Sequence, residues 1–435
     1  MHLTTREIPV QNLKVGMYVS RLDVPWVQTP FPIQGFHVSR QEELDLLGHY
    51  CNKVYVDIFL SNVEVKSQLT LASLVKKPQD EIDPKIARLM NEKARFKPRV
   101  EDYQVSNKLN KEIKSASKLF NDITAQMSAL YRSMEQNGYI NVSEVRAASK
   151  AMVKSIIHNP NALAWLCRIH NDDQALHQQS VRSAVWALIF ARHLGLSKHD
   201  LRDLGMALLL APIGKSKLPR ELLFSQANSE EVQEYQEHVT LTLEETEKMF
   251  STSHQVNYIL AAYCERNNGS GYPRNLAGNR IPFLARIAGL ADYYEQLINP
   301  YSGADALTPA QAISHLYEIR GNLFQKELIE EFIQAIGIYP TGSLVKLSDN
   351  SIGVVVEQPE KSRLRPRVAI LKDSMNVLVE KPKTINLAKK IKDDCGLPLQ
   401  IDKSLKSTSK DINAHEIHQK LFGGNSWFSF VTDKL

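Results

Sequence analysis

The chain has 435 residues, of which 43% are hydrophobic and 23% are charged, so it has the composition of a folded globular protein with length for several domains. The net charge of +5 is small for this length and no apolar run reaches roughly 18 residues, so we expect neither nucleic acid nor membrane as a partner. The N-terminus lacks a signal peptide's apolar core and the four cysteines are widely spaced, which predicts a cytoplasmic protein without a disulfide scaffold.

The first part of the chain, residues 1–62, predicts a small α+β domain. β-branched and aromatic residues in three segments indicate strands, and "RQEELDLLGHY" indicates a short helix between the last two; the strand segments are 15–26, 31–39 and 52–59. Residues 63–141 are expected to form a linker and then one long amphipathic helix. That helix, at about 101–134, is a connector or a dimer seam in our interpretation.

The middle of the chain, residues 142–340, predicts a mostly helical domain. Helical spacing of apolar residues marks its segments, and Gly195 is placed to end the first of them; they are 180–196, 200–211, 229–250, 281–298, 308–319 and 326–336. After Gly342 the period changes to that of strands, so residues 341–382 predict a small β-module. Residues 383–435 then form a charged tail with a last helix.

One apolar helix ends in an unusual way. Residues 208–215 read "LLLAPIGK", so a proline and a glycine interrupt the run directly before Lys215. Proline restricts the residue before it and donates no backbone hydrogen bond, so Pro212 is expected to shorten the helix. Lys215 is either a phosphate contact or a solvated lysine.

The sharpest local signal is the loop "ERNNGSGYPRNLAGNRIP" at residues 265–282. Its glycines allow backbone N–H groups to approach a phosphate closely, Tyr272 offers a ring on which a base can stack, and three arginines add positive charge. The alternative is a connector between helices that is rich in turn residues. Two nearby residues are also open to two interpretations. His238 is a site residue or a surface histidine on an acidic helix, and Asp292 interrupts an apolar helix, where a carboxylate needs a partner or a metal.

The order "IGK … LPRELL … H … ER-x-x-GSGYP … RIAGLAD … PY" resembles the HD-GYP family of bacterial HD phosphohydrolases. The resemblance runs from about Asn159 to Asp373, and the segments before and after it are similar to the small domain and the β-module of one subfamily. It implies an all-helical HD-type domain flanked by a small N-terminal α+β domain and a small C-terminal β-module. Active members hold two or three iron- or manganese-type ions and hydrolyse cyclic di-GMP.

Several metal-ligand positions of the family are changed in this sequence. Ala211 and Pro212 stand where the His-Asp pair belongs, and Gln179 stands at the first metal histidine. The His-His-Glu triplet reads Tyr263-Cys264-Glu265, and the Asp before GSGYP is Asn268; His238, Glu265 and Asp292 match. A pair of cations needs several oxygen or imidazole ligands, and alanine and proline offer none, so the resemblance implies no catalytic residue and no metal site here. A remodelled single zinc or iron site with Cys264 as a ligand is the alternative.

The sequence therefore predicts a catalytically degenerate HD-GYP signalling protein. We expect it to bind cyclic di-GMP or to dock a GGDEF-type signalling protein without hydrolysis, and a homodimer is left open. The expected ligand-binding residues are Lys215, Arg266, Gly269, Gly271, Tyr272, Pro273, Arg274 and Arg286. A cyclic di-GMP phosphodiesterase with a remodelled metal site is the first alternative, and a scaffold or dimerisation protein is the second.

Overall fold

A computed structural model describes most of the chain. The described residues are 5–24, 36–38, 40–57, 101–137, 140–169, 176–219, 222–223, 229–248, 253–300, 305–358, 364–380, 382–389, 391–392, 396–406, 417–418 and 421–422. The expected linker at 63–100 lies outside them. Within the described part of the chain, no helix combines the length and the apolar character that crossing a bilayer requires.

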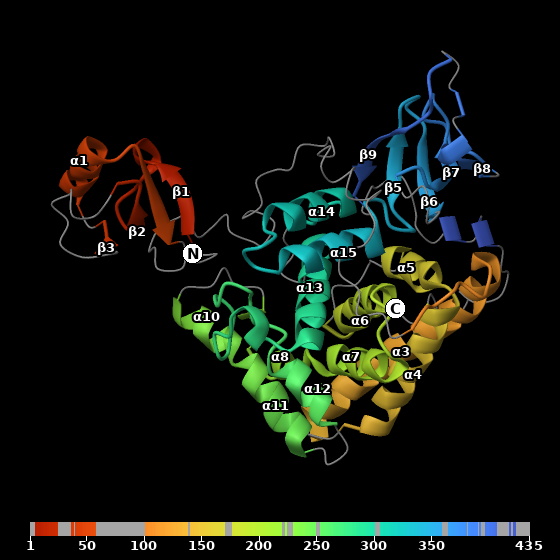
Figure 1. Ribbon diagram of the computed structural model, residues 1–435, viewed down its shortest axis with the longest axis horizontal. Helices are drawn as coiled ribbons and strands as arrows, with labels where there is room; N and C mark the ends of the chain where they lie inside the picture. The colour runs from red at the N-terminus through yellow and green to blue at the C-terminus, as the bar shows by residue number, and fades with distance from the viewer. Residues whose placement is uncertain are drawn as a thin grey trace.

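The N-terminal unit is a small α+β fold, as predicted (Figure 1). Its antiparallel sheet has the order β1-β4-β2-β3, and its elements are β1 (Thr5–Pro9), β2 (Tyr18–Leu22), β3 (Phe36–His37), α1 (Gln41–Tyr50) and β4 (Lys53–Asp57). Val19 and Val54 point from the sheet and Leu47 from α1 into a core of their own, and each of the three is fully buried. The alternation of these residues along the strands buries one face of the sheet against α1.

The middle of the chain is helical, as predicted. The bounds of its helices are α3 (Leu109–Asn137), α4 (Val142–His158), α5 (Pro160–Ile169), α6 (Leu176–His193), α7 (Lys198–Leu210), α8 (Ile213–Ser216), α10 (Ser229–Gln236), α11 (His238–Lys248), α12 (His254–Leu260), α13 (Phe283–Ile298), α14 (Pro309–Glu318) and α15 (Lys326–Ile336). Gly195 has a φ of 72° just after α6, so it supplies the left-handed residue that the sequence predicted at this helix end.

The long amphipathic helix begins eight residues later than the first residue of its predicted segment and belongs to the helical core. Ile113, Phe120 and Met127 of α3 are at most 4% exposed and pack in the same core cluster as α4 to α7. The apolar stripe of α3 is therefore covered within the chain.

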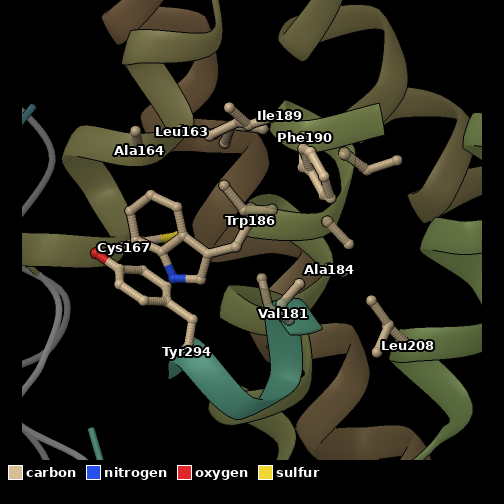
Figure 2. Close-up of a cluster of buried hydrophobic side chains, with 14 of the residues drawn as sticks. Leu163, Ala164, Cys167, Val181, Ala184, Trp186, Ile189, Phe190, Leu208 and Tyr294 are labelled. Carbon is tan, nitrogen blue, oxygen red and sulfur yellow. The ribbon is translucent and has the colours of Figure 1, made fainter. Parts of the chain in front are cut away.

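Helices α6 and α13 form the central seam of this domain. Figure 2 shows Trp186 of α6 beside Tyr294 of α13, and their ring centroids are 5.5 Å apart in an edge-to-face arrangement. Beside them, Arg182 Nε of α6 donates to Glu295 Oε1 of α13 over 2.5 Å, and both side chains are at most 2% exposed. A buried ion pair with little freedom sets the register of one helix against the other.

The C-terminal β-module is an antiparallel sheet in the order β8-β7-β6-β5-β9 (Figure 1). Its strands are β5 (Leu344–Leu347), β6 (Ile352–Glu357), β7 (Arg367–Lys372), β8 (Thr384–Asn386) and β9 (Ile401–Leu405), so the sheet continues beyond the predicted limit of 382. The predicted tail helix falls mainly outside the described residues. Its described turns contact α5, where Trp165 Nε1 donates to His418 Nδ1 over 3.2 Å.

Candidate functional site

The candidate site lies where α8 and the start of α11 meet the loop after α12 and the middle of α13 (Figure 1). The unusual helix end explains how α8 arises. Helix α7 stops at Leu210, Pro212 has φ −77° and ψ 2°, and the chain restarts as the four-residue α8. Ala211 is 4% exposed, so the two positions without a donor are inside the fold.

Gly214 brings α8 unusually close to α11. A Cβ at this position would lie 1.9 Å from the carbonyl oxygen of His238, which no other residue type can accommodate without a shift. The Gly214 N–H donates to Thr242 Oγ1 over 2.9 Å, and this hydroxyl lies 2.8 Å from the same carbonyl oxygen. The "IGK" sequence thus serves the packing of two helices.

His238 is fully buried, so the interpretation of a surface histidine is wrong. The sequence suggested one 229–250 helix, but α10 ends at Gln236 and His238 starts α11, which turns its ring inward. Its Nδ1 lies 2.6 Å from the carbonyl oxygen of Tyr235, and its Nε2 lies 3.0 Å from the hydroxyl of Tyr263. A carbonyl can only accept, so Nδ1 carries the hydrogen and the Nε2 lone pair accepts from the Tyr263 O–H.

Aromatic rings and a thiol complete the surroundings of this imidazole. The ring centroids of Tyr235 and Tyr272 lie 4.9 and 5.8 Å from that of His238. Cys264 Sγ is 3.8 Å from Nε2. Burial, with a smaller contribution from Lys215, lowers the pKa of His238 to about 3, and burial raises the pKa of the Cys264 thiol. The imidazole and the thiol are therefore both uncharged at neutral pH.

Lys215 supplies the positive charge of the site from inside the fold. Its side chain is 5% exposed, and Nζ lies 5.8 Å from the centre of the Tyr235 ring. Burial alone lowers the pKa of Lys215, but Tyr235, Asp292 and Cys264 together raise it above the ordinary value. Lys215 is thus a buried ammonium, and the alternative of a solvated lysine is wrong.

Asp292 is held by hydrogen bonds from two neighbouring side chains. Ser183 Oγ donates to Oδ1 over 2.9 Å, and Gln296 Nε2 donates to Oδ2 over 2.5 Å. Gln179 lies one turn before Ser183 on α6, is 3% exposed, and has no hydrogen-bond partner for Oε1 among the described residues. This acceptor stands at the position where the resemblance implies a metal histidine.

The backbone of the glycine-rich loop is fixed by the buried side chain of Glu265. This carboxylate is 3% exposed and accepts the N–H groups of Arg274 at 2.8 Å and of Leu276 at 2.9 Å. A Cβ on Gly271 would lie 2.3 Å from the backbone of residues 265 and 266, so only glycine allows the loop to fold onto its own start. The Tyr272–Pro273 peptide bond is cis. Glu265 acts here as a clamp on backbone donors.

Two of the expected ligand-binding arginines make internal contacts. Arg266 donates to the carbonyl oxygen of its neighbour Glu265 over 2.9 Å, and its guanidinium lies 5.7 Å and 5.2 Å from the ring centres of Tyr293 and Phe324. Arg286 donates to the Ile281 carbonyl and to Gln325 Oε1 over 2.8 and 2.6 Å. Their role in ligand binding stays a prediction.

The loop residues that face solvent are few. Pro273, Arg274, Asn275, Asn279 and Arg280 are exposed, Gly269 is half-buried with a φ of 78°, and Gly271 is buried. The structure thus separates the expected binding residues into an interior group around Lys215 and an exposed group around Arg274. The resemblance placed Tyr263 near His238, but sequence reasoning did not predict their hydrogen bond, because a separation of 25 positions gives no periodic signal.

The residues present do not fit the metal pair that the resemblance implies. Among the residues that the structure describes, no three His, Cys, Asp or Glu side chains lie close enough to hold one metal ion. The lone pair of His238 that would bind a cation is used by Tyr263, and an ammonium occupies the same neighbourhood. Cys264 and His238 alone do not complete a zinc site, which takes at least three protein ligands.

Three family models match the chain. Residues 167–328 match the HD domain, residues 5–145 match a domain of unknown function (DUF3391), and residues 344–392 match the KOW domain associated with HD domain. The last two correspond to the segments before and after the helical domain.

Curated relatives extend the comparison. A cyclic di-GMP phosphodiesterase of Pseudomonas aeruginosa is 27% identical over 84% of this chain and 84% of its own length. A cyclic di-GMP phosphodiesterase response regulator of Xanthomonas campestris is 30% identical over 34% of this chain and 39% of its own length. A solved HDG"Y"P protein from Bdellovibrio bacteriovorus aligns with a TM-score of 0.44 and 15% identity over 75% of this chain and 98% of that one.

The family models and the curated relatives agree with the order of motifs in the sequence and support its resemblance to HD-GYP proteins. The helical region, the β-module and the N-terminal segment each have a counterpart in a family model. Residues 167–328 therefore form an HD domain, and the two curated relatives are named as phosphodiesterases of cyclic di-GMP.

Proposed function

We propose that this chain is a catalytically degenerate HD-GYP signalling protein that binds a cyclic dinucleotide or a GGDEF-type partner without hydrolysing the nucleotide. The observation that carries the proposal is the hydrogen bond between Tyr263 and Nε2 of His238, because it occupies the lone pair that metal-assisted hydrolysis needs. Ala211 and Pro212 offer no donor atoms to replace it.

Binding remains chemically reasonable without the metal pair. The backbone of the loop around Arg274 is fixed by Glu265, so an incoming anion or acidic surface meets the exposed Arg274 side chain on a preorganised backbone. Cyclic di-GMP carries two phosphates, and a hydrogen bond from an arginine to a charged group contributes about 1.5–3 kcal/mol. The names of the relatives support cyclic di-GMP as the first ligand to test.

The test is a calorimetric titration of the purified full-length chain with cyclic di-GMP, followed by chromatography for the linear product after incubation with manganese or iron. We expect no linear product. We also expect Arg274→Ala to weaken binding by roughly 10- to 150-fold, whereas Arg365→Ala, an exposed arginine of the β-module, leaves affinity unchanged.

Linear product from the unmodified chain would overturn the absence of hydrolysis, and equal affinity of Arg274→Ala and the control would overturn the role of the loop. If cyclic di-GMP does not bind, a titration with a purified GGDEF domain tests the docking form with the same two variants. Ala211→His combined with Pro212→Asp is expected to give no turnover, because Gln179 and Tyr263 remain.

A phosphodiesterase with a remodelled single metal site is the second candidate. The separation of 3.8 Å between Cys264 Sγ and His238 Nε2 favours it, because two such ligands on one tetrahedral zinc lie about 3.5 Å apart. Metal analysis of the chain used in the hydrolysis assay decides between the two candidates.

A further inference from the structure

The interior of the candidate site contains a hydroxyl and an ammonium group close to the metal-ligand positions of the HD-GYP family. We propose that the hydroxyl of Tyr263 and the ammonium of Lys215 together do the structural work of a bound metal, so that the glycine-rich loop is held in its binding shape whether or not metal is present. The inference rests on the proposed function and concerns the regulation of the same site: the conformation of the loop is independent of the concentration of iron or manganese.

The first part of the argument is the lone pair of His238. Its Nδ1–H is fixed on the Tyr235 carbonyl at 2.6 Å, so Nε2 must find a proton donor or a metal. The Tyr263 O–H lies 3.0 Å from Nε2 and satisfies it. Burial raises the pKa of Tyr263 well above its ordinary value, so this hydroxyl keeps its proton.

The second part is the backbone, which leaves the pair little room to separate. A Cβ on Gly214 would lie 1.9 Å from the His238 carbonyl oxygen, and a Cβ on Gly289 of α13 would lie 2.2 Å from the Tyr263 carbonyl oxygen. Helix α8 thus presses on one partner and helix α13 on the other. The hydrogen bond is a product of this packing and stays in place without an ion between the helices.

The third part is the balance of charge. Lys215 is 5% exposed and interacts electrostatically with Asp292, while His238 and Cys264 are uncharged. The ammonium and the carboxylate therefore offset each other. A divalent cation entering this cluster would meet a buried positive charge, and the Asp292 carboxylate already interacts with that charge, which opposes binding of the cation.

The cluster is joined to the binding loop through the chain itself. Tyr263 is two residues before Glu265, whose carboxylate holds the backbone N–H groups of Arg274 and Leu276. Arg266 then donates back to the Tyr263 carbonyl over 3.3 Å. A fixed Tyr263 therefore fixes the position of Glu265 and of the loop above it, and Tyr263 is a positioning residue.

The experiment uses the full-length chain purified with a chelator. Metal content and the unfolding midpoint are measured for the unmodified protein, with EDTA and with added Mn²⁺, Fe²⁺ or Zn²⁺. We expect substoichiometric metal and one midpoint under all these conditions. Bound metal near one equivalent, or a midpoint that falls with EDTA, would overturn the proposal.

A pair of substitutions tests the same idea from the other side. Tyr263→His with Lys215→Met removes both substitutes and leaves two imidazoles, the Cys264 thiol and the Asp292 carboxylate, so this variant is expected to take up close to one equivalent of zinc. Tyr258→His with Lys383→Met makes the same exchanges at exposed positions and is expected to take up none. A soluble, folded Tyr263→His/Lys215→Met variant that excludes zinc would contradict the proposal.

If that variant does not fold, the chelator measurement on the unmodified chain still decides the matter. The outcome is separate from that of the proposed function, which is judged on linear nucleotide product. A chain that binds metal yet forms no product would overturn only the inference about Tyr263 and Lys215, whereas product formed by a metal-free chain would overturn only the proposed function.

Discussion

The strongest stability prediction concerns Glu295, whose replacement by glutamine breaks a buried network. Both partners of the ion pair are inside the core, with Glu295 fully buried and Arg182 at 2% exposed. The carboxylate also accepts from Trp186 Nε1 and from Asn299 Nδ2, each over 2.8 Å. Arg168, which is 4% exposed, feels the same negative charge. Glutamine keeps the shape and removes the charge on which these groups depend.

The expected magnitude follows from what is left behind. Removing one partner of a buried ion pair costs about 3–5 kcal/mol, because the remaining charge is buried without compensation. In Glu295→Gln, the guanidinium groups of Arg182 and Arg168 lose the negative charge of the carboxylate. In addition, the amide NH₂ of glutamine replaces one carboxylate oxygen, so a donor then faces the donors that this oxygen accepted from. We therefore expect Glu295→Gln to lose about 4–5 kcal/mol, in the upper part of that range.

The pair as a whole contributes far less than its breakage costs. Burial raises the pKa of Glu295 despite the opposing effect of Arg182, which means that removal from water outweighs the attraction. The double variant Arg182→Met/Glu295→Met should therefore lose less than the sum of its single variants. Its remaining loss comes mainly from the donors of Trp186 and Asn299, at about 1–3 kcal/mol each.

Urea unfolding followed by tryptophan fluorescence and circular dichroism measures these free energies, with Glu327→Gln as the control. Glu327 is an exposed glutamate of α15, and its variant should stay within about 0.5 kcal/mol of the unmodified chain. A loss below about 1 kcal/mol for Glu295→Gln would refute the reasoning. The register of α6 against α13, and with it the contact of Ser183 with Asp292, would then depend on packing alone.

Two further predictions test the site's surroundings. In the same urea assay, Gly214→Ala should destabilise the fold by about 1–3 kcal/mol or more, since the added Cβ would lie 1.9 Å from the His238 carbonyl oxygen. Gly48→Ala is the control and should not destabilise, because its Cβ would meet nothing closer than 3.7 Å. Equal losses for the two variants would refute the packing argument. Burial lowers the pKa of His315, which contacts Tyr293, from 6.5 to about 4. The contribution of neutral His315 to the free energy of unfolding is complete above pH 6.5 and falls by up to about 3 kcal/mol as the pH drops towards 4, because the unfolded chain binds the proton first. In urea titrations between pH 7.5 and 4.5, His315→Gln should reduce the dependence of this free energy on pH. An unchanged pH dependence would contradict the low pKa of His315.

The elements that could be predicted from sequence are those governed by local chemistry. The β-branched and aromatic residues of 52–59 and the short helix predicted at 40–50 correspond to β4 and α1, and Gly195 ends α6 in the left-handed conformation that was expected. Strands β5, β6 and β7 lie within 341–382, where the change of period after Gly342 predicted a β-module. In each case neighbouring residues specify the backbone.

The parts of the site that could not be predicted depend on distant partners. Lys215, Arg266 and Arg286 look alike in a sequence, as cations beside glycines and turns. Their surroundings are the Asp292 carboxylate, a pair of aromatic rings and a backbone carbonyl, respectively. The break between α10 and α11 was missed for the same reason. Continuous helical spacing predicts one helix, whereas the chain bends there to bury His238 against Tyr263.

This dependence on distant partners also explains how an intact glycine-rich loop can accompany an altered metal centre in one sequence. Glu265, Gly271 and Arg266 shape the loop through backbone hydrogen bonds and a close approach that involve no metal. The positions that read Ala211 and Pro212 carry no part of that loop. The shape of the loop and the binding of metal are therefore separate physical requirements in this fold, and the proposed function needs only the first.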